Sequence, residues 1–247
     1  MAGRYDSNQA FERIEKSVSG YQVGNRTESL AQLAWFLHVS FRMEDPEDDP
    51  SINEALCDGG NDKGIDALVP SHPTRELFLF QSKRSRNGRS QEGDTELRKL
   101  YAAREFFASR AAVEGLLKGK INEELRGLLM RHEVPQLVED GYEIRLCFVT
   151  NSELAKDARE FIDAVGKGSP ELLDVWDRPR LNGLAEETQP AELCPDDCAL
   201  TAPAGWTRLD LAGGVAMVVT VVPAVDLVRL PGIDDLKLFG GFRIPCG

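Results

Sequence analysis

Three residues of the types that bind a metal ion and stabilise a phosphate lie near one another in this 247-residue sequence. Asp66 follows a glycine-rich run, and Gln81 and Lys83 follow the apolar run Leu77-Phe-Leu-Phe80. Carboxylate and amide oxygens are hard ligands suited to Mg²⁺, and an ammonium group can stabilise charge that develops on a phosphate. These residue types therefore indicate metal-assisted phosphoester chemistry, provided that the fold brings them together.

The elements expected to position them are two strands of a β-hairpin. Residues 64–69 and 77–83 read as strands, and Ser71-His-Pro-Thr74 between them has turn chemistry. A turn centred near Pro73 makes the numbers of opposed residues sum to about 146 to 149, so Asp66 is expected opposite Gln81 or Lys83, roughly 5 Å away between Cβ atoms. Gln81 and Lys83 are two positions apart and therefore project from the same side of their strand.

Two interpretations of this arrangement compete. In the simpler one, Asp66 and Lys83 form a cross-strand ion pair beside the polar amide of Gln81. In the other, Asp66 and the carbonyl oxygen of Gln81 bind Mg²⁺, which takes few protein carboxylates and fills its remaining positions with water and substrate phosphate. Lys83 would then face the attacking water and the scissile phosphate.

The two runs together resemble a known family. The residues Asp58-Gly-Gly-Asn-Asp-Lys-Gly-Ile-Asp66 and Gln81-Ser-Lys83 are similar to the core of the PD-(D/E)xK nucleases, in the Mrr-like version where Gln replaces the second acid. More narrowly, they resemble the N-terminal region of the abortive-infection phage-resistance (AIPR) family. The long C-terminal portion typical of that family has no counterpart here, and residues 240–247 depart from its pattern.

This resemblance implies a role for each matching position. Asp66 would be the metal-binding carboxylate, Gln81 would stand in place of the second acid, and Lys83 would be the catalytic lysine. The backbone carbonyl of Ser82 would be a further metal ligand. Mg²⁺ would be the cofactor, with Mn²⁺ able to substitute. Because Gln81 is neutral, the site would hold one negative charge fewer and bind a divalent metal more weakly unless another acid compensates.

The resemblance also implies a glutamate on a helix before the hairpin. Glu28 is our choice, as a fourth catalytic and metal-binding residue, and Glu54 and Glu12 are the alternatives. Glu28 is equally well explained as a favourable partner of the helix dipole, since it follows Thr27, a suitable N-cap residue.

Charge is distributed unevenly along the chain. The net charge of −12 counts against a general nucleic-acid-binding protein. Residues 75–104, however, contain eight basic and four acidic residues. We expect phosphate contacts in this stretch from Lys83, Arg84, Arg86 and Arg89, although a solvated loop would have the same composition. The acidic loop 44–50 would repel DNA and is expected to face away from it.

The composition is that of an ordinary globular protein, and we expect the protein in the cytoplasm. No apolar run is long enough for a membrane helix, and the first residues lack the apolar segment of a signal peptide. An odd number of cysteines, five, argues for reduced thiols. Cys194 and Cys198 have the spacing of half a zinc site, but only Cys246 follows them, so zinc is not predicted.

The fold class predicted is α/β, a restriction-endonuclease-like core with a central mixed β-sheet flanked by helices. A strand at 142–150, a helix at 153–165 capped by Ser152 and a strand at 172–176 predict a parallel crossover that extends the hairpin's sheet. Further helices are expected at 5–20, 27–43, 94–115 and 122–132. Residues 1–184 would form this core, 185–204 a connector, and 205–247 a β-rich extension packed on the core. Within this extension, residues 206–211 and 214–222 would form either a hairpin or strands that close the edge of the sheet.

The sequence therefore predicts a metal-dependent endonuclease that hydrolyses phosphodiester bonds in DNA, with RNA as an alternative substrate, in bacterial defence against phage. The defence role rests on the resemblance alone. A homodimer is an expected partner state, because nucleases that cut both strands of a duplex often pair two copies. The alternative function is a nucleic-acid-binding or partner-binding module on the same fold, without turnover.

Overall fold

The structure is a computed structural model that describes residues 6–24, 26–41, 43, 50–57, 59–169, 171–188, 206–210 and 216–220. Its helices are α1 (Ser7–Ser19), α2 (Glu28–Phe41), α3 (Pro50–Ala55), α4 (Asp94–Ala103), the 3₁₀ helix η1 (Arg104–Phe107), α5 (Arg110–Lys118), α6 (Glu123–Arg131), α7 (Val134–Glu139), α8 (Lys156–Gly168) and α9 (Arg178–Thr188). Its strands are β1 (Ala67–Ser71), β2 (Glu76–Lys83), β3 (Gln91–Glu92), β4 (Glu143–Thr150), β5 (Glu153–Leu154), β6 (Leu173–Trp176), β7 (Trp206–Asp210) and β8 (Ala216–Thr220).

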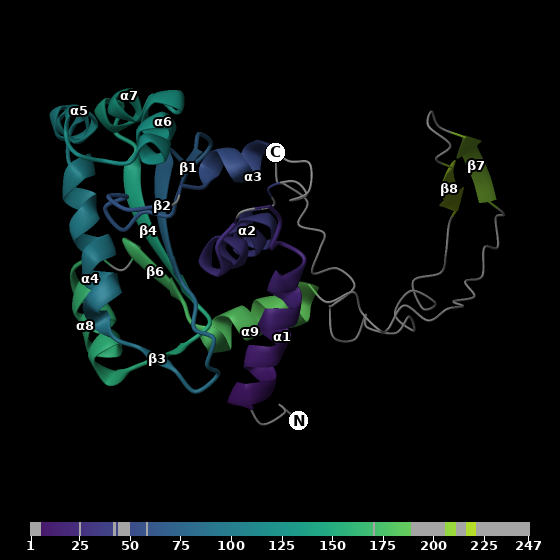
Figure 1. Ribbon diagram of the computed structural model, residues 1–247. Helices are drawn as coiled ribbons and strands as arrows, with labels where there is room; N and C mark the ends of the chain where they lie inside the picture. Colours follow the sequence, from purple (N-terminus) through teal and green to yellow (C-terminus); the bar gives the residue numbers. More distant parts are fainter. Residues whose placement is uncertain are drawn as a thin grey trace. The chain divides into compact units, whose positions relative to one another are not determined.

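A mixed sheet of four strands, in the order β1-β2-β4-β6, lies at the centre of the fold (Figure 1). β1 and β2 form the predicted antiparallel hairpin, and Ala67 is paired with Phe80. β4 runs parallel to β2, and β6 runs parallel to β4, with α8 between them in the sequence. The observed pairing of Ala67 with Phe80 lies within the predicted range of registers, and the predicted parallel crossover is confirmed.

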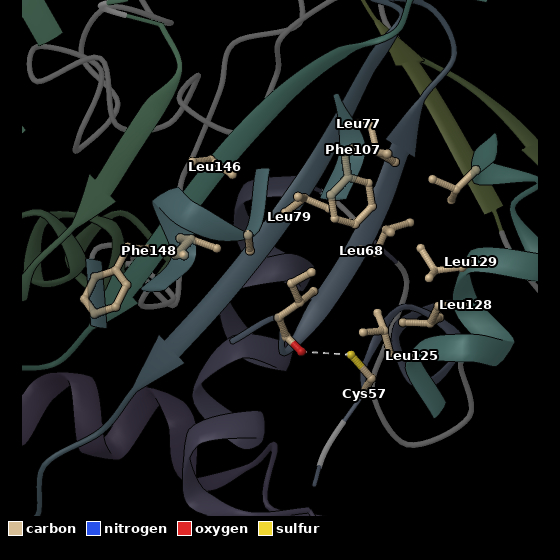
Figure 2. Packing of buried hydrophobic residues seen from close by; sticks show 14 of the residues in the cluster. Cys57, Leu68, Leu77, Leu79, Phe107, Leu125, Leu128, Leu129, Leu146 and Phe148 are labelled. Atoms are coloured by element: carbon tan, nitrogen blue, oxygen red, sulfur yellow. Dashed lines mark hydrogen bonds between the residues drawn. The ribbon is translucent and has the colours of Figure 1, made fainter. Parts of the chain in front are cut away.

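Helices cover both faces of this sheet. The buried residues of α4 to α8 share one apolar cluster with Leu68, Leu77 and Leu79 of the hairpin. Figure 2 shows these leucines packed against residues of η1 and α6, with Cys57 at the margin of the cluster. The buried residues of α1, α2, α3 and α9 share a second cluster with Ala67 and Phe80. Because alternate strand residues point to opposite faces, the hairpin contributes to both cores.

The strands are apolar on both faces because both faces are covered, which is usual for parallel sheets. Within β2, the residues before Lys83 are almost continuously buried. Gln81 and Ser82 extend this buried run at 2% and 1% exposure, although their side chains are polar. Two buried polar residues at the carboxyl end of a central strand need hydrogen-bond partners, and the two faces supply different ones.

Two predicted helix boundaries were wrong. The helix expected at 94–115 is interrupted by η1, and a new helix begins after Ser109, whose hydroxyl accepts a hydrogen bond from the Ala112 amide at 3.2 Å. A serine cap competes with helix continuation, and Phe107 is buried in the core at the break. Ser152 does not cap the helix that follows it, because residues 153–154 form β5, which pairs with β3, and α8 begins at Lys156.

The chain divides into two compact units, Met1–Glu186 and Glu187–Gly247. The first holds the central sheet and corresponds to the core predicted for residues 1–184. In the second, the described residues are the end of α9 and the antiparallel pair β7–β8, so of the two arrangements expected at 206–222 the antiparallel pairing is observed. The acidic loop 44–49, Asp58, Cys194, Cys198, Cys246 and most of the predicted connector 185–204 lie outside the described residues. Among the helices that are described, none combines the length and apolar character of a membrane span.

Candidate functional site

Asp66 lies one position before β1 and continues the hairpin pairing. Its amide donates a hydrogen bond to the carbonyl of Phe80 at 2.7 Å. Its carboxylate Oδ2 accepts a hydrogen bond from the amide of Ser82, also at 2.7 Å. Extending the β1–β2 register by one residue places Asp66 opposite Gln81, so the two side chains share a face of the sheet. The Asp66 carboxylate is thereby fixed beside the carboxyl end of β2.

The glycine-rich loop before Asp66 closes over Gln81. Asp62 accepts a hydrogen bond from the Gly64 amide through Oδ1 at 2.8 Å, as expected for an aspartate that stabilises its own loop. Gly64 has φ +77°, and a Cβ built there would lie 3.4 Å from Nε2 of Gln81. Glycine permits both this backbone conformation and this close approach.

Gln81 is buried, and only half of its amide is bonded. Its Nε2 donates to Oε2 of Glu96 on α4 at 3.1 Å. Its Oε1 is inaccessible to solvent and has no hydrogen-bond partner in the described part of the chain. A buried acceptor without a partner is costly, so this oxygen has an unused capacity to bind a cation or a proton donor.

Lys83 meets the same carboxylate. Its Nζ lies 3.3 Å from Oε2 of Glu96, and its side chain is 39% exposed. Lys99, also on α4, binds the other carboxylate oxygen, Oε1, at 2.6 Å. Burial would raise the pKa of Glu96, but the hydrogen bond from Lys99 and the charge of Lys83 outweigh it and hold that pKa below its ordinary value. Glu96 is therefore an anion at neutral pH and holds both lysines.

A second carboxyl group faces this cluster. Burial and the nearby charge of Glu96 raise the pKa of Glu92 on β3, against the opposing effect of Lys83. Neither Glu92 nor Glu96 was among the residues predicted from the sequence. Acids at 94 and 96 in the first turn of a predicted helix were visible, but the helix dipole explains them equally well.

The helix α2, which begins at Glu28, packs on the other face of the sheet. α2 packs in the cluster that contains Ala67 and Phe80, and its Gln32 bonds the hydroxyl of Ser82 at 3.2 Å. The Glu28 carboxylate accepts a hydrogen bond from Nε of Arg86 at 3.0 Å, which lowers the pKa of Glu28. The Glu28 carboxylate is therefore paired with Arg86 of the basic loop, and its assignment as a metal ligand stays a prediction. Of the alternatives, Glu12 is exposed on α1, and Glu54 is exposed on α3.

The basic loop after β2 is partly neutralised by acids. Arg84 forms two hydrogen bonds to the carboxylate of Glu15 on α1, and its side chain is only 10% exposed. Arg86 pairs with Glu28 but is 85% exposed. Arg89 is exposed, and no ion pair involves its side chain in the part of the chain that the structure describes. Arg84 therefore holds the loop to α1, whereas Arg86 and Arg89 remain accessible from solvent.

The cluster at the end of β2 has the donor types expected of a hard-cation site. Asp66 and Glu96 supply carboxylates, and Gln81 supplies the buried oxygen without a partner. The described residues contain no group of three or more His, Cys, Asp or Glu side chains that could hold a metal by themselves. Mg²⁺ needs only one or two protein carboxylates, so the donor types of the cluster fit it.

The cluster lies at the carboxyl end of β2, apart from two cavities described elsewhere on the first unit. Two cavities of about 540 and 510 Å³ are lined by residues at the other end of β4, such as Glu143 and Arg145, and include no residue of the cluster. The partial exposure of Lys83 gives a large ligand access from the strand ends. Comparison of the chain with family models, curated proteins and solved structures found no match to any of them.

Proposed function

We propose that this protein is a metal-dependent endonuclease whose site lies at the carboxyl end of β2. The observation that carries the proposal is the convergence of Asp66, Gln81 and Lys83 on one face of the hairpin, as the resemblance to the PD-(D/E)xK nucleases requires. The mixed four-stranded sheet with helices on both faces suits a restriction-endonuclease-like core. The role in defence against phage rests on the AIPR-like motif alone.

In this mechanism, Asp66, the amide oxygen of Gln81 and the carbonyl of Ser82 hold Mg²⁺. The bound ion supplies a polarised phosphate and a water of lowered pKa. Lys83 donates hydrogen bonds from Nζ to the attacking water and to the non-bridging oxygens, where negative charge develops. Only part of the Lys83 ammonium is engaged by Glu96, because an ammonium group has three donors. Exposed Arg86 and Arg89 contact phosphates on either side of the scissile bond.

The test is cleavage of supercoiled plasmid DNA and of single-stranded RNA by the purified chain with Mg²⁺ or Mn²⁺. Asp66→Asn is the decisive variant, because the remaining side-chain oxygen can still accept the hydrogen bond from Ser82 while the negative charge is lost. Cleavage should require metal and fall at least a hundredfold in this variant. Asp140→Asn, at an exposed position after α7, is the matched control. Metal-dependent cleavage that persists undiminished in Asp66→Asn would refute the proposal.

The second candidate function is a nucleic-acid-binding or partner-binding module without turnover. The neutral Gln81 favours it, because the strand lacks the second acid. Gln81→Glu separates the two. A glutamate at this position would face Glu96 across the present 3.1 Å hydrogen bond, so the variant should lose stability without metal and bind Mn²⁺ more tightly. A gain of cleavage would indicate a dormant site, whereas unchanged metal affinity would indicate a different geometry.

A further inference from the structure

One carboxylate contacts both functional side chains of β2. Oε2 of Glu96 accepts the hydrogen bond from Nε2 of Gln81 at 3.1 Å and lies 3.3 Å from Nζ of Lys83. Glu96 belongs to α4, which is separated from β2 by the basic loop and the short strand β3. α4 therefore places an acid in contact with Gln81, the residue that occupies the position of the second acid in the resembling family.

Glu96 is sheltered and charged at the same time. Its side chain is 20% exposed, less than Lys83 or Lys99. The ammonium groups of Lys83 and Lys99 lie 3.3 and 2.6 Å from its two carboxylate oxygens. An ordinary surface ion pair would not require both oxygens of one carboxylate to be held by three donors from two elements. The arrangement keeps an anionic oxygen oriented toward the end of β2.

The Gln81 amide provides the second observation. Its Nε2 faces Glu96, while Oε1 is buried without a partner in the described structure. Rotation of the amide by half a turn exchanges these two atoms, so that Oε1 faces Glu96. Two oxygens that face one another repel unless a cation lies between them. In the structure, the donor Nε2 of Gln81 faces Glu96, whereas a cation bound between the two side chains would need the acceptor Oε1 at that position.

We propose that Glu96 supplies the second carboxylate of the divalent-cation site, and that the Gln81 amide rotates when the cation binds. This inference rests on the proposed function and deepens it, because it names the ligand that compensates for the missing acid of β2. Glu28, which is paired with Arg86, then has no part in holding the ion. Lys83 is released from Glu96 by the ion and becomes available to the phosphate.

The first test is isothermal titration calorimetry of the full chain with MnCl₂, with thermal unfolding as a check of folding. The variants are Glu96→Gln, Glu28→Gln and Asp66→Asn, with Glu114→Gln at an exposed ion pair on α5 as the control. Glu96→Gln should weaken Mn²⁺ binding at least tenfold, and the control should bind like the wild type. Mn²⁺ affinity of Glu96→Gln within twofold of the wild type would overturn the inference, as would a larger loss in Glu28→Gln.

The calorimetry separates this inference from the proposed function. If Asp66→Asn abolishes Mn²⁺ uptake while Glu96→Gln retains it, the metal site stands and the role of Glu96 is rejected. If the wild type takes up no Mn²⁺, both are rejected. A merely structural Glu96, which only pairs with Lys83 and Lys99, would change the melting temperature and leave the Mn²⁺ affinity unchanged.

The second test follows the Gln81 amide directly. In a ¹⁵N-labelled sample, the side-chain NH₂ signal of Gln81 is assigned by its disappearance in Gln81→Glu. Addition of Mg²⁺ should move this signal, because the group loses its bond to the Glu96 carboxylate, and Glu96→Gln should reduce the movement. A signal that is unaffected by saturating Mg²⁺ in a chain that binds the ion would reject the amide rotation.

Discussion

The two sides of the β2 carboxyl end use polar residues in different ways. On the side of α4, Gln81 and Lys83 meet the charged Glu96, and Lys83 is partly exposed. On the side of α1 and α2, Ser82 Oγ donates to the carbonyl of Ser29 at 2.9 Å and accepts from Gln32, and both Ser82 and Gln32 are fully buried. Adjacent residues of one strand therefore enter two different environments.

The comparison shows that an unbonded buried oxygen does not by itself mark a site. Oε1 of Gln32 also has no partner among the described residues. The Nε2 of Gln32, however, lies within 3.3 Å of the carbonyls of Lys83 and Val149, and this neutral pocket is closed to solvent. Beside Gln81 there are carboxylates and an accessible lysine. Charge and access, added to the unbonded oxygen, distinguish the α4 side as the place for chemistry.

Among substitutions that test the difference between the two sides, the largest effect is expected at Lys83. Lys83→Ala should lower the rate of metal-dependent cleavage about 10²- to 10³-fold, because it removes a donor directed at developing charge. The melting temperature should hardly change, since the ion pair with Glu96 is partly exposed. Plasmid cleavage and thermal unfolding measure the two effects, and Lys156→Ala on α8 is the control. A large loss of stability would show that Lys83 has a structural role, like the buried residues on the side of α1 and α2.

On the side of α1 and α2, a substitution should lower stability. Gln32→Leu removes a buried donor from Ser82 Oγ and from two carbonyls, and we expect a loss of about 2–3 kcal/mol in the free energy of unfolding. Urea unfolding measures it, with Gln9→Leu at an exposed position of α1 as the control. A change below about 0.5 kcal/mol would show that this network is dispensable.

The loop over Gln81 provides a smaller test. Gly64→Ala should cost about 1 kcal/mol, because alanine disfavours φ +77°. Mn²⁺ affinity should fall as well, since relief of this strain would move the loop that contacts the Gln81 amide at 3.4 Å. Gly60→Ala, where an added Cβ meets nothing within 4 Å, is the matched control. Equal effects of the two substitutions would argue against a specific fit between Gly64 and Gln81.

The smallest effect concerns pH and Glu92. Because its pKa is raised above the ordinary value of 4.5 in the folded protein, ionisation of Glu92 costs stability as the pH rises through the raised pKa. Glu92→Gln lacks this cost, so the variant should be more stable than the wild type at neutral pH, by less than about 1 kcal/mol because solvent screens the group. The difference should vanish at a pH below 4.5. Thermal unfolding between pH 4 and 8 would test this, and a variant less stable at neutral pH would contradict it.

Much of the fold followed from local pattern. Turn residues at 71–74 between two apolar runs predicted the hairpin and a narrow range of registers, and the β-prone run at 142–150 followed by an amphipathic helix predicted the parallel crossover. The predicted helix boundaries were wrong where a local interaction, a helix cap or a short strand pairing, replaced the expected helix. Ser109 capped a new helix inside a pattern that otherwise suited one long helix, and residues 153–154 joined a two-residue strand instead of the helix.

The sequence alone determined that Gln81 and Lys83 share a face of their strand, because side chains alternate along a strand. The range of registers that the turn allowed included Asp66 on either face, and the observed register places it on the face of Gln81. Only the tertiary structure decided which acid joins them. Glu28 and Glu96 both lie in the first turn of a helix near the site in sequence, but α2 packs on one face of the sheet and α4 on the other. The choice of face depends on the burial of whole helices against the sheet, and no local spacing contains that information.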